Sequence, residues 1–192
     1  MTPTNHIPTS LYTYMDSPIG RLLLCGDEQR LSHLYTAPHS DNPEAVRERR
    51  RADAPFADVR DQLEAYFAGD RVEFDVALNT DGAPAFFTTV WHRLLAIPFG
   101  TTVSYGELAR ELGRPTAARA VGTANGRNPI AIIVPCHRVI GSSGALTGYA
   151  GGIERTRYLL RHEAEVVSRS PHQPGSAREH VLERAAAGHY LE

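Results

Sequence analysis

The first 83 residues alternate between short apolar runs and polar turns, which predicts a small α/β domain. Arg21–Cys25 is expected to form a strand after the turn Ser17–Gly20, and Leu31–Tyr35 is its expected partner across a second turn. Apolar residues at helical spacing predict a helix over 57–68. Alternating apolar residues over 72–78 then predict a half-buried strand.

Two polar segments divide the chain. Residues 36–55 carry three prolines and the charge run Arg47–Arg51, and we expect a long solvated connection there. The segment 79–84 is the best candidate for a domain boundary, so the predicted domains are 1–83 and 84–167. Residues 168–192 are predicted to be a flexible tail with a short helix near 177–187.

The second domain is predicted to be mainly helical. Apolar positions over 86–97 indicate one helix. Ser104 and Glu107 have capping-box spacing and are expected to begin a short helix that ends near Leu112. The fold class is therefore α+β, with a small α/β domain followed by a helical domain.

A second short helix follows after the break at 113–115. Thr116 is expected to cap it and residues 117–124 to form it, which gives a pair typical of a helix-turn-helix. Its residues are mostly alanine and glycine, whereas a major-groove helix needs long polar side chains to read bases. Two interpretations stay open: tight packing against a neighbouring helix, or a slim helix in the minor groove with Arg119 projecting into the duplex.

The candidate chemistry lies at Cys136-His137. The apolar run Ile130–Val134 is predicted to be a buried strand that Pro135 ends, because proline has no N–H for a ladder. Cys136 then stands where a rigid element opens into a loop, which is a common place for reactive side chains. From these residues alone, a core cysteine is an equally good interpretation.

Composition narrows the class of protein. The chain has 192 residues, 42% hydrophobic and 22% charged, as in globular proteins, and we expect a cytoplasmic protein without a signal peptide or membrane span. Its two cysteines suggest no disulfide framework, and Cys25 with His33 on a neighbouring strand would be too few ligands for zinc. Residues 1–83 hold 8 Arg and 14 acidic residues, whereas 84–167 hold 9 and 5. A basic second half is compatible with a polyanionic partner.

The second half resembles a known family, the O(6)-alkylguanine-DNA alkyltransferases, also called methylated-DNA–protein-cysteine methyltransferases. The resemblance is strong over about 84–165 and weaker over 11–83. It rests on segments at the family's spacing, namely Asp16–Gly20, Ser104-Tyr105, Ala118–Gly122, Asn128-Pro129, Pro135–Val139, Gly148-Tyr149 and Glu163. Phe87 and Ala150 depart from the common pattern. The resemblance implies a ribonuclease-H-like first domain and no cofactor, and zinc-binding relatives carry more N-terminal ligands than this chain has.

The resemblance also implies a mechanism. Cys136 would attack the alkyl carbon on guanine O6 as a thiolate, the nucleophilic form of the side chain. Glu163 would orient His137, and His137 would take the thiol proton through a bridging water. Asn128 would brace the active-site turn, and Tyr105 would hydrogen-bond the guanine ring. The alkylated cysteine would not be regenerated, so each molecule would act once.

The same resemblance assigns substrate and DNA contacts. Tyr149 would form part of the pocket wall, and backbone groups at Cys136, Val139 and Ala150 would read the guanine edge. The flipped base would leave a gap that Arg119 fills. The remaining expected DNA contacts are small residues of the same helix and its cap, Thr116, Ala118, Ala120 and Gly122.

The expected partner is duplex DNA that contains O6-alkylguanine, bound by a protein that is monomeric in solution. A cysteine hydrolase is the first alternative, since Cys, His and Glu can form a triad. A non-catalytic damage sensor is the second, although such sensors lack the cysteine. A helix-turn-helix regulator is the third. The sequence leaves open the tolerated alkyl size, activity on O4-alkylthymine and cooperative assembly on DNA.

Overall fold

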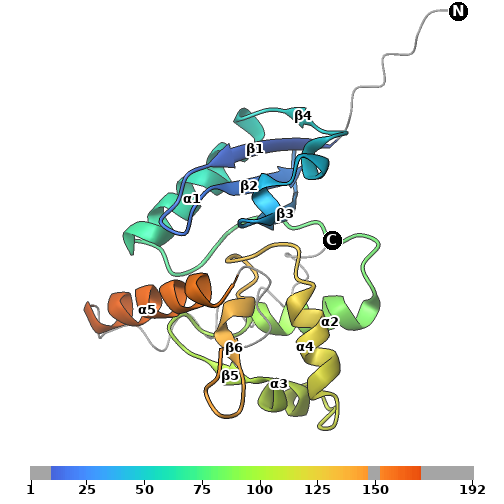
Figure 1. Cartoon of the computed structure of the whole chain (residues 1–192), viewed down its shortest axis with the longest axis vertical. Coiled ribbons are helices and arrows are strands. Elements are labelled where there is room, and N and C mark those ends of the chain that lie inside the picture. Colours follow the sequence, from blue (N-terminus) through green and yellow to red (C-terminus); the bar gives the residue numbers. More distant parts are fainter. Residues whose placement is uncertain (1–9, 147–151, 170–192) are drawn as a thin grey trace, which may run out of the picture.

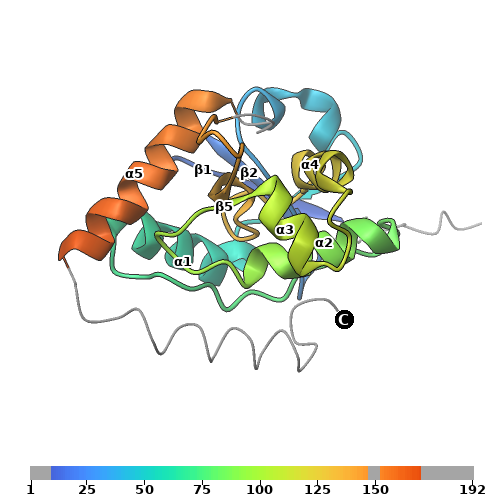
Figure 2. The same cartoon turned by 90° about the horizontal axis from the view of Figure 1, so that it is seen from below.

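A computed structural model describes residues 10–146 and 152–169 of the chain. The sheet of the first domain and its helix α1 (Ala57–Ala68) lie on one side of the molecule, and the helices of the second domain lie on the other (Figure 1). Helix α5 (Ile153–Arg169) runs along the junction on the side where α1 lies, as the two views show together (Figures 1 and 2). The α+β prediction is confirmed.

The first domain is built on a four-stranded sheet in the order β3-β2-β1-β4. β1 pairs antiparallel with β2, and β2 pairs antiparallel with β3, while the edge strand β4 runs parallel to β1. The strands are β1 (Leu11–Met15), β2 (Leu22–Gly26), β3 (Leu31–Tyr35) and β4 (Arg50–Arg51). The predicted hairpin is therefore present, and Cys25 stands opposite His33 in its register.

The first domain departs from the sequence prediction in three places. β1 was not expected, although its buried and half-buried residues alternate as in a half-buried strand. Residues 72–78 bend at Val72 and Glu73 and form only one bridge, Leu78 with Leu31. The Gln62 side chain, rather than a neighbouring strand, bonds the backbone of Asp75. The segment 36–55 is not merely a solvated connection. It holds β4 and three short 3₁₀ helices, η1 (His39–Asp41), η2 (Pro43–Val46) and η3 (Ala54–Phe56).

The second domain is mainly helical, as predicted. Its helices and short strands are α2 (Ala85–Leu95), β5 (Val103–Ser104), α3 (Tyr105–Glu111), α4 (Ala118–Gly126), η4 (Cys136–Arg138), β6 (Val139–Ile140) and α5. The Ser104–Glu107 capping box is confirmed, with both of its reciprocal hydrogen bonds present. The predicted cap of the next helix is wrong, because Ala117 is the N-cap of α4 and no side chain caps it.

Residues 130–134 are mostly buried, as predicted, but the prediction that they form a strand is wrong. Only Ile130 forms a bridge, with Leu34 of β3, and the chain then turns so that Val134 N–H donates to Ile130 C=O at 3.0 Å. Ile132 has a φ of 71°, a left-handed conformation that a β-branched residue rarely adopts. The turn is buried between the domains, and so a continuously apolar run is also compatible with a turn.

Helix α5 continues through Ser168 and Arg169, which were predicted to belong to a flexible tail. The predicted helix near 177–187 lies outside the described residues, as do Tyr149 and Ala150. Within residues 10–146 and 152–169, no helix has the length and apolar content needed to cross a membrane.

Candidate active site and nucleic-acid interface

Cys136 begins η4 directly after the buried turn. Its side chain is buried, with 4% of the residue exposed. Burial raises the pKa of the Cys136 thiol to about 11, and a hydrogen bond from the Asn128 side chain offsets part of that rise. The resting site therefore holds a neutral thiol, so a nucleophilic thiolate requires a nearby base that accepts the proton.

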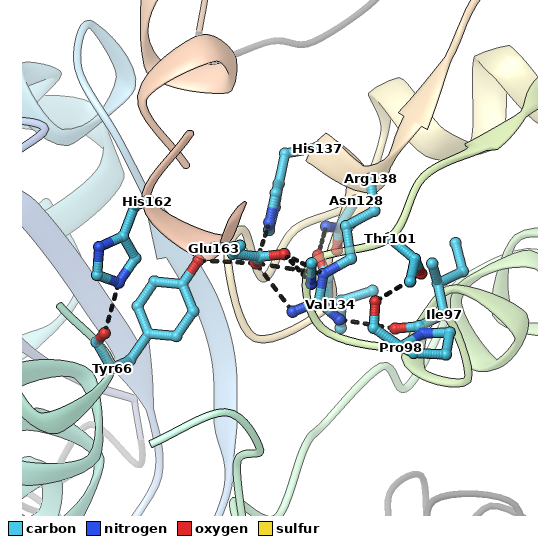
Figure 3. Close-up of polar contacts among 11 residues, drawn as sticks. Tyr66, Ile97, Pro98, Thr101, Asn128, Val134, His137, Arg138, His162 and Glu163 are labelled. Carbon is cyan, nitrogen blue, oxygen red and sulfur yellow. Dashed lines mark hydrogen bonds and ion pairs between the residues drawn. The ribbon is translucent and has the colours of Figure 1, made fainter. Parts of the chain in front are cut away.

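His137 and Glu163 meet in the core of the second domain, and both are completely buried. His137 Nε2 lies 2.8 Å from Glu163 Oε1 (Figure 3). The histidine comes from η4 and the glutamate from α5, 26 residues further along the chain. This contact is the pairing that the resemblance implied.

Among the described residues, every hydrogen-bond partner of the Glu163 carboxylate is a donor. Arg138 donates from Nε and Nη2 at 2.9–3.2 Å, and Tyr66 donates its hydroxyl to Oε1 at 2.9 Å (Figure 3). Gly100 donates its backbone N–H to Oε2 at 2.9 Å. Burial alone would raise the pKa of Glu163, but the hydrogen bonds from His137 and Arg138 and the positive charge of Arg138 outweigh it and hold that pKa far below its usual range. Glu163 is therefore a carboxylate.

The carboxylate fixes the tautomer of His137. Because Glu163 can only accept, the proton of the imidazole must lie on Nε2, which leaves the lone pair on Nδ1. Burial lowers the pKa of His137, so the ring is neutral at rest. Nδ1 is buried and has no hydrogen-bond partner within residues 10–146 and 152–169. It is a base with an unused lone pair next to Cys136 in the sequence.

Two asparagines hold the turn that carries Cys136. Asn128 accepts from Ile130 N–H at 3.0 Å and donates to Val134 C=O at 2.8 Å, which closes the turn. Asn125 of α4 donates to the Cys136 carbonyl at 3.2 Å. The bracing role that the resemblance gave Asn128 agrees with these contacts, whereas Asn125 was not predicted.

Tyr105 stands at the start of α3, close to the thiol. Burial raises the pKa of Tyr105, the charge that Cys136 would carry raises it further, and a hydrogen bond with Asn125 lowers it. The phenol is therefore protonated at neutral pH. Its ring packs on Gly122 of α4, where an added Cβ would lie 3.7 Å from the ring. A Cβ at this position would make an ordinary van der Waals contact, so packing alone does not require glycine here.

Helix α4 has one buried and one exposed face. Val121, Ala124 and Asn125 face the core, and Trp91 Nε1–H donates to Ala124 C=O at 2.8 Å. Arg119 and Ala120 are exposed, as is Thr116 just before the helix, while Ala118 and Gly122 are half-buried. The exposed face therefore carries one long cationic side chain among small residues. Whether these residues contact DNA stays a prediction.

A cavity of about 470 Å³ reaches Cys136 at the junction of the domains. Its walls include His33, Tyr35 and His39 of the first domain, where the rings of His33 and Tyr35 stack at 5.1 Å. Asn128 and Ala131 line it from the second domain. A hollow of this size is in the range of small-molecule pockets. Tyr149 and Ala150 of the predicted guanine pocket lie outside the described residues, whereas Val139 is buried in β6 directly after η4.

Besides Asn125, three residues around Glu163 were missed by sequence reasoning. Arg138 stood inside the recognised motif without a role, Tyr66 was interpreted only as an apolar position of its helix, and Gly100 only as the end of another. Arg138 also donates to Ile97 C=O at 2.7 Å and lies 5.5 Å from the Phe99 ring centroid. An arginine next to Cys-His was the one signal available. In the described ranges, no three His, Cys, Asp or Glu residues lie close enough together to hold a metal ion.

The fold and site together define a protein that places a buried cysteine, beside a histidine–carboxylate pair, in the same domain as a helix-turn-helix. Family models match both domains. Residues 10–80 match the ribonuclease-like domain of 6-O-methylguanine DNA methyltransferase, and residues 85–165 match its DNA-binding domain.

Relatives match over most of the chain. A methylated-DNA–protein-cysteine methyltransferase of Mycobacterium bovis is 52% identical over 160 residues, which cover 83% of this chain and 94% of the relative. One of Methanosarcina acetivorans is 47% identical over 79% of this chain and 97% of its own. The crystal structure of the Mycobacterium tuberculosis O6-methylguanine methyltransferase has a TM-score of 0.77 at 51% identity, covering 85% of this chain and 96% of that one. A structure of Mycobacterium tuberculosis OGT in complex with DNA has a TM-score of 0.75, covering 81% and 94%. The chain belongs to the 6-O-methylguanine DNA methyltransferase family.

Proposed function

We propose that this protein repairs O6-alkylguanine in duplex DNA by transferring the alkyl group to Cys136 in a single event. The observation that carries the proposal is the hydrogen bond between His137 and Glu163, which fixes the imidazole proton on Nε2. His137 directly follows the buried Cys136. This arrangement leaves an unused lone pair on Nδ1 of the residue that follows Cys136. The excess of arginine over acidic residues in 84–167 and the DNA complex of a 51% identical relative support DNA as the substrate.

In the proposed reaction, Nδ1 of His137 takes the Cys136 proton through a bridging water, and the sulfur attacks the alkyl carbon. The S–C bond forms as the C–O6 bond breaks, and the electron pair of that bond passes into the guanine ring. The guanine gains a proton in place of the alkyl group, which balances the proton that the thiol lost. Glu163 stabilises the imidazolium, and the Tyr105 hydroxyl donates to the charge that develops on guanine.

A thiol held protonated at rest suits a protein that acts once. It avoids reaction with other electrophiles until the substrate is bound, because the neutral thiol is a poor nucleophile. The product is a thioether, which His137 and Glu163 cannot hydrolyse. The protein is therefore consumed stoichiometrically, and we propose that it needs no cofactor. It would act in the cytoplasm, where reducing conditions keep both cysteines as thiols.

The target base must leave the duplex, at a cost of a few kcal/mol, to reach a buried sulfur. We propose that α4 lies in the minor groove and that Arg119 fills the gap in the stack. Thr116, Ala118, Ala120 and Gly122 would allow the close approach of the helix to the DNA. Tyr149, Val139 and Ala150 would line the guanine pocket, and O4-alkylthymine would be a second substrate.

The test is the intact mass of the protein after mixing with a duplex that contains one O6-methylguanine, followed by peptide mapping. One methyl group per molecule, located on Cys136 and saturating there, is the expected result. Cys136→Ala is the control, and it should bind the duplex without gaining mass. A wild-type protein that binds the lesion but stays unmodified would indicate a sensor. A protein that ignores the duplex and hydrolyses esters would indicate a cysteine hydrolase.

A further inference from the structure

Tyr66 connects the first domain to Glu163, the carboxylate that orients His137. It lies on α1, is completely buried, and donates its hydroxyl to Glu163 Oε1 at 2.9 Å across 97 residues of sequence (Figure 3). Oε1 is also the atom that accepts from His137 Nε2–H. The ribonuclease-like domain therefore contributes one donor to the same oxygen that orients the base.

Contacts of its backbone and its ring fix the position of Tyr66. His162, the neighbour of Glu163 on α5, lies with Nε2 2.7 Å from the Tyr66 carbonyl oxygen, which can only accept. The Tyr66 ring contacts Phe67 and Phe74 of its own domain and Phe99 of the other, with centroid distances of 5.3–5.9 Å. The hydroxyl thus has a defined place relative to α5, and a tyrosine side chain held by packing loses little further entropy in making the bond.

The other donors to Glu163 do not by themselves restrain Oε1 from the side of the first domain. Arg138 bonds both oxygens of Glu163 and so does not by itself select which oxygen faces His137. Gly100 N–H holds Oε2. The carboxylate torsion of glutamate is broad and roughly two-fold, so the plane of the group is held by the hydrogen bonds to its two oxygens. Tyr66 supplies the restraint on Oε1 from the side of the first domain.

We propose that Tyr66 is a positioning residue for alkyl transfer: its hydroxyl holds Glu163 Oε1 in the orientation that receives the Nε2–H of His137. The inference rests on the proposed function, because it assigns Tyr66 a part in the same proton relay. It gives the ribonuclease-like domain a part in the chemistry without a substrate contact. Tyr66 acts through Glu163 and His137, and the thiol of Cys136 reports its effect.

The experiment compares Tyr66→Phe with Phe74→Leu in the full-length protein. Tyr66→Phe removes the hydroxyl and keeps the ring, whereas Phe74→Leu loosens the packing of that ring and keeps the hydroxyl. Three quantities are measured: the rate of methyl transfer from the lesion duplex, the affinity for that duplex, and the pH dependence of Cys136 alkylation by iodoacetamide. Peptide mapping separates Cys136 from Cys25, and thermal unfolding reports stability.

Tyr66→Phe should slow methyl transfer about tenfold, as expected for one hydrogen bond to a charged group, and leave DNA affinity unchanged. The rate of Cys136 alkylation falls at low pH, and in Tyr66→Phe this low-pH limb should move to higher pH. The reason is that a carboxylate free to turn stabilises the His137 imidazolium less well. Phe74→Leu should lower the melting temperature and leave the rate and the limb as in wild type. If Tyr66 had only a structural role, Tyr66→Phe would lower the melting temperature and leave the rate of methyl transfer and the pH dependence of alkylation as in wild type.

Any of three outcomes overturns the proposal. They are a Tyr66→Phe protein with the wild-type rate, a Tyr66→Phe protein with an unmoved or lowered limb, and a Phe74→Leu protein slowed as much as Tyr66→Phe. The iodoacetamide reaction needs no DNA, so it separates the two inferences. If wild type transfers no methyl although Tyr66→Phe moves the limb, the proposed repair function fails. If wild type transfers methyl and the limb does not move, the role of Tyr66 fails.

Discussion

Replacement of Glu163 by glutamine tests the charge at the centre of the site. The carboxylate accepts from His137, Arg138, Tyr66 and Gly100 through two oxygens, whereas a glutamine amide offers one oxygen and an NH₂ group. Whichever way the amide turns, at least one buried donor faces another donor. The Arg138 side chain, 7% exposed, also loses its only ion-pair partner within the described residues.

The expected loss of stability is large. Breaking a buried ion pair by removing one partner costs about 3–5 kcal/mol, because the other charge stays buried and uncompensated. That is a sizeable part of the roughly 5–15 kcal/mol by which a domain is stable. The matched control is Glu165→Gln on the same helix, where the carboxylate is 55% exposed and its Arg161 and Arg169 partners lie 4.0 and 3.9 Å away. We expect that control to cost less than about 1 kcal/mol.

The assay is urea unfolding of the three proteins at several pH values, with the midpoint compared at constant slope. The folded-state pKa of Glu163 is lowered by His137 and Arg138, so its stabilising effect is fully present above the unfolded-state pKa of about 4.3 and is lost as the pH falls below it. The gap between wild type and Glu163→Gln should therefore narrow below about pH 4. A gap under about 1 kcal/mol at pH 7 would refute the reasoning. So would a gap that is independent of pH.

Three further predictions concern separate parts of the molecule. Burial lowers the pKa of His33 to about 4, with a smaller effect of the Arg49 charge, so the folded state should lose stability as pH falls from about 6.5 towards 4, and His33→Phe should flatten that slope in urea unfolding. Asn128→Ala removes the bonds that close the active-site turn and should cost about 1–3 kcal/mol and slow methyl transfer, measured on the same preparation. Arg119→Ala should slow transfer from duplex DNA but not from the free base O6-methylguanine, and equal slowing on both would contradict its role in base extrusion.

Local signals in the sequence predicted much of the fold. The hairpin of β2 and β3, helix α1 and the capping box at Ser104 depend on residues within a few positions of one another, and the structure has them close to the predicted bounds. The same kind of signal failed at Ile130–Val134, because burial and strand formation are separate properties. The side chain of Asn128 supplies the hydrogen bonds that a neighbouring strand would have supplied.

The site could not be derived from local pattern, because its contacts join distant segments. Glu163 bonds groups that lie 25, 26, 63 and 97 residues away, and α5 itself was not predicted. Only resemblance to a family placed Glu163 with His137, and even that left Arg138 and Tyr66 without roles. A buried carboxylate is stable only when several donors surround it. A catalytic role for Glu163 therefore predicts further buried donors, such as a tyrosine or an arginine, elsewhere in the chain. Tyr66 satisfies that expectation from the domain in which no chemistry was predicted.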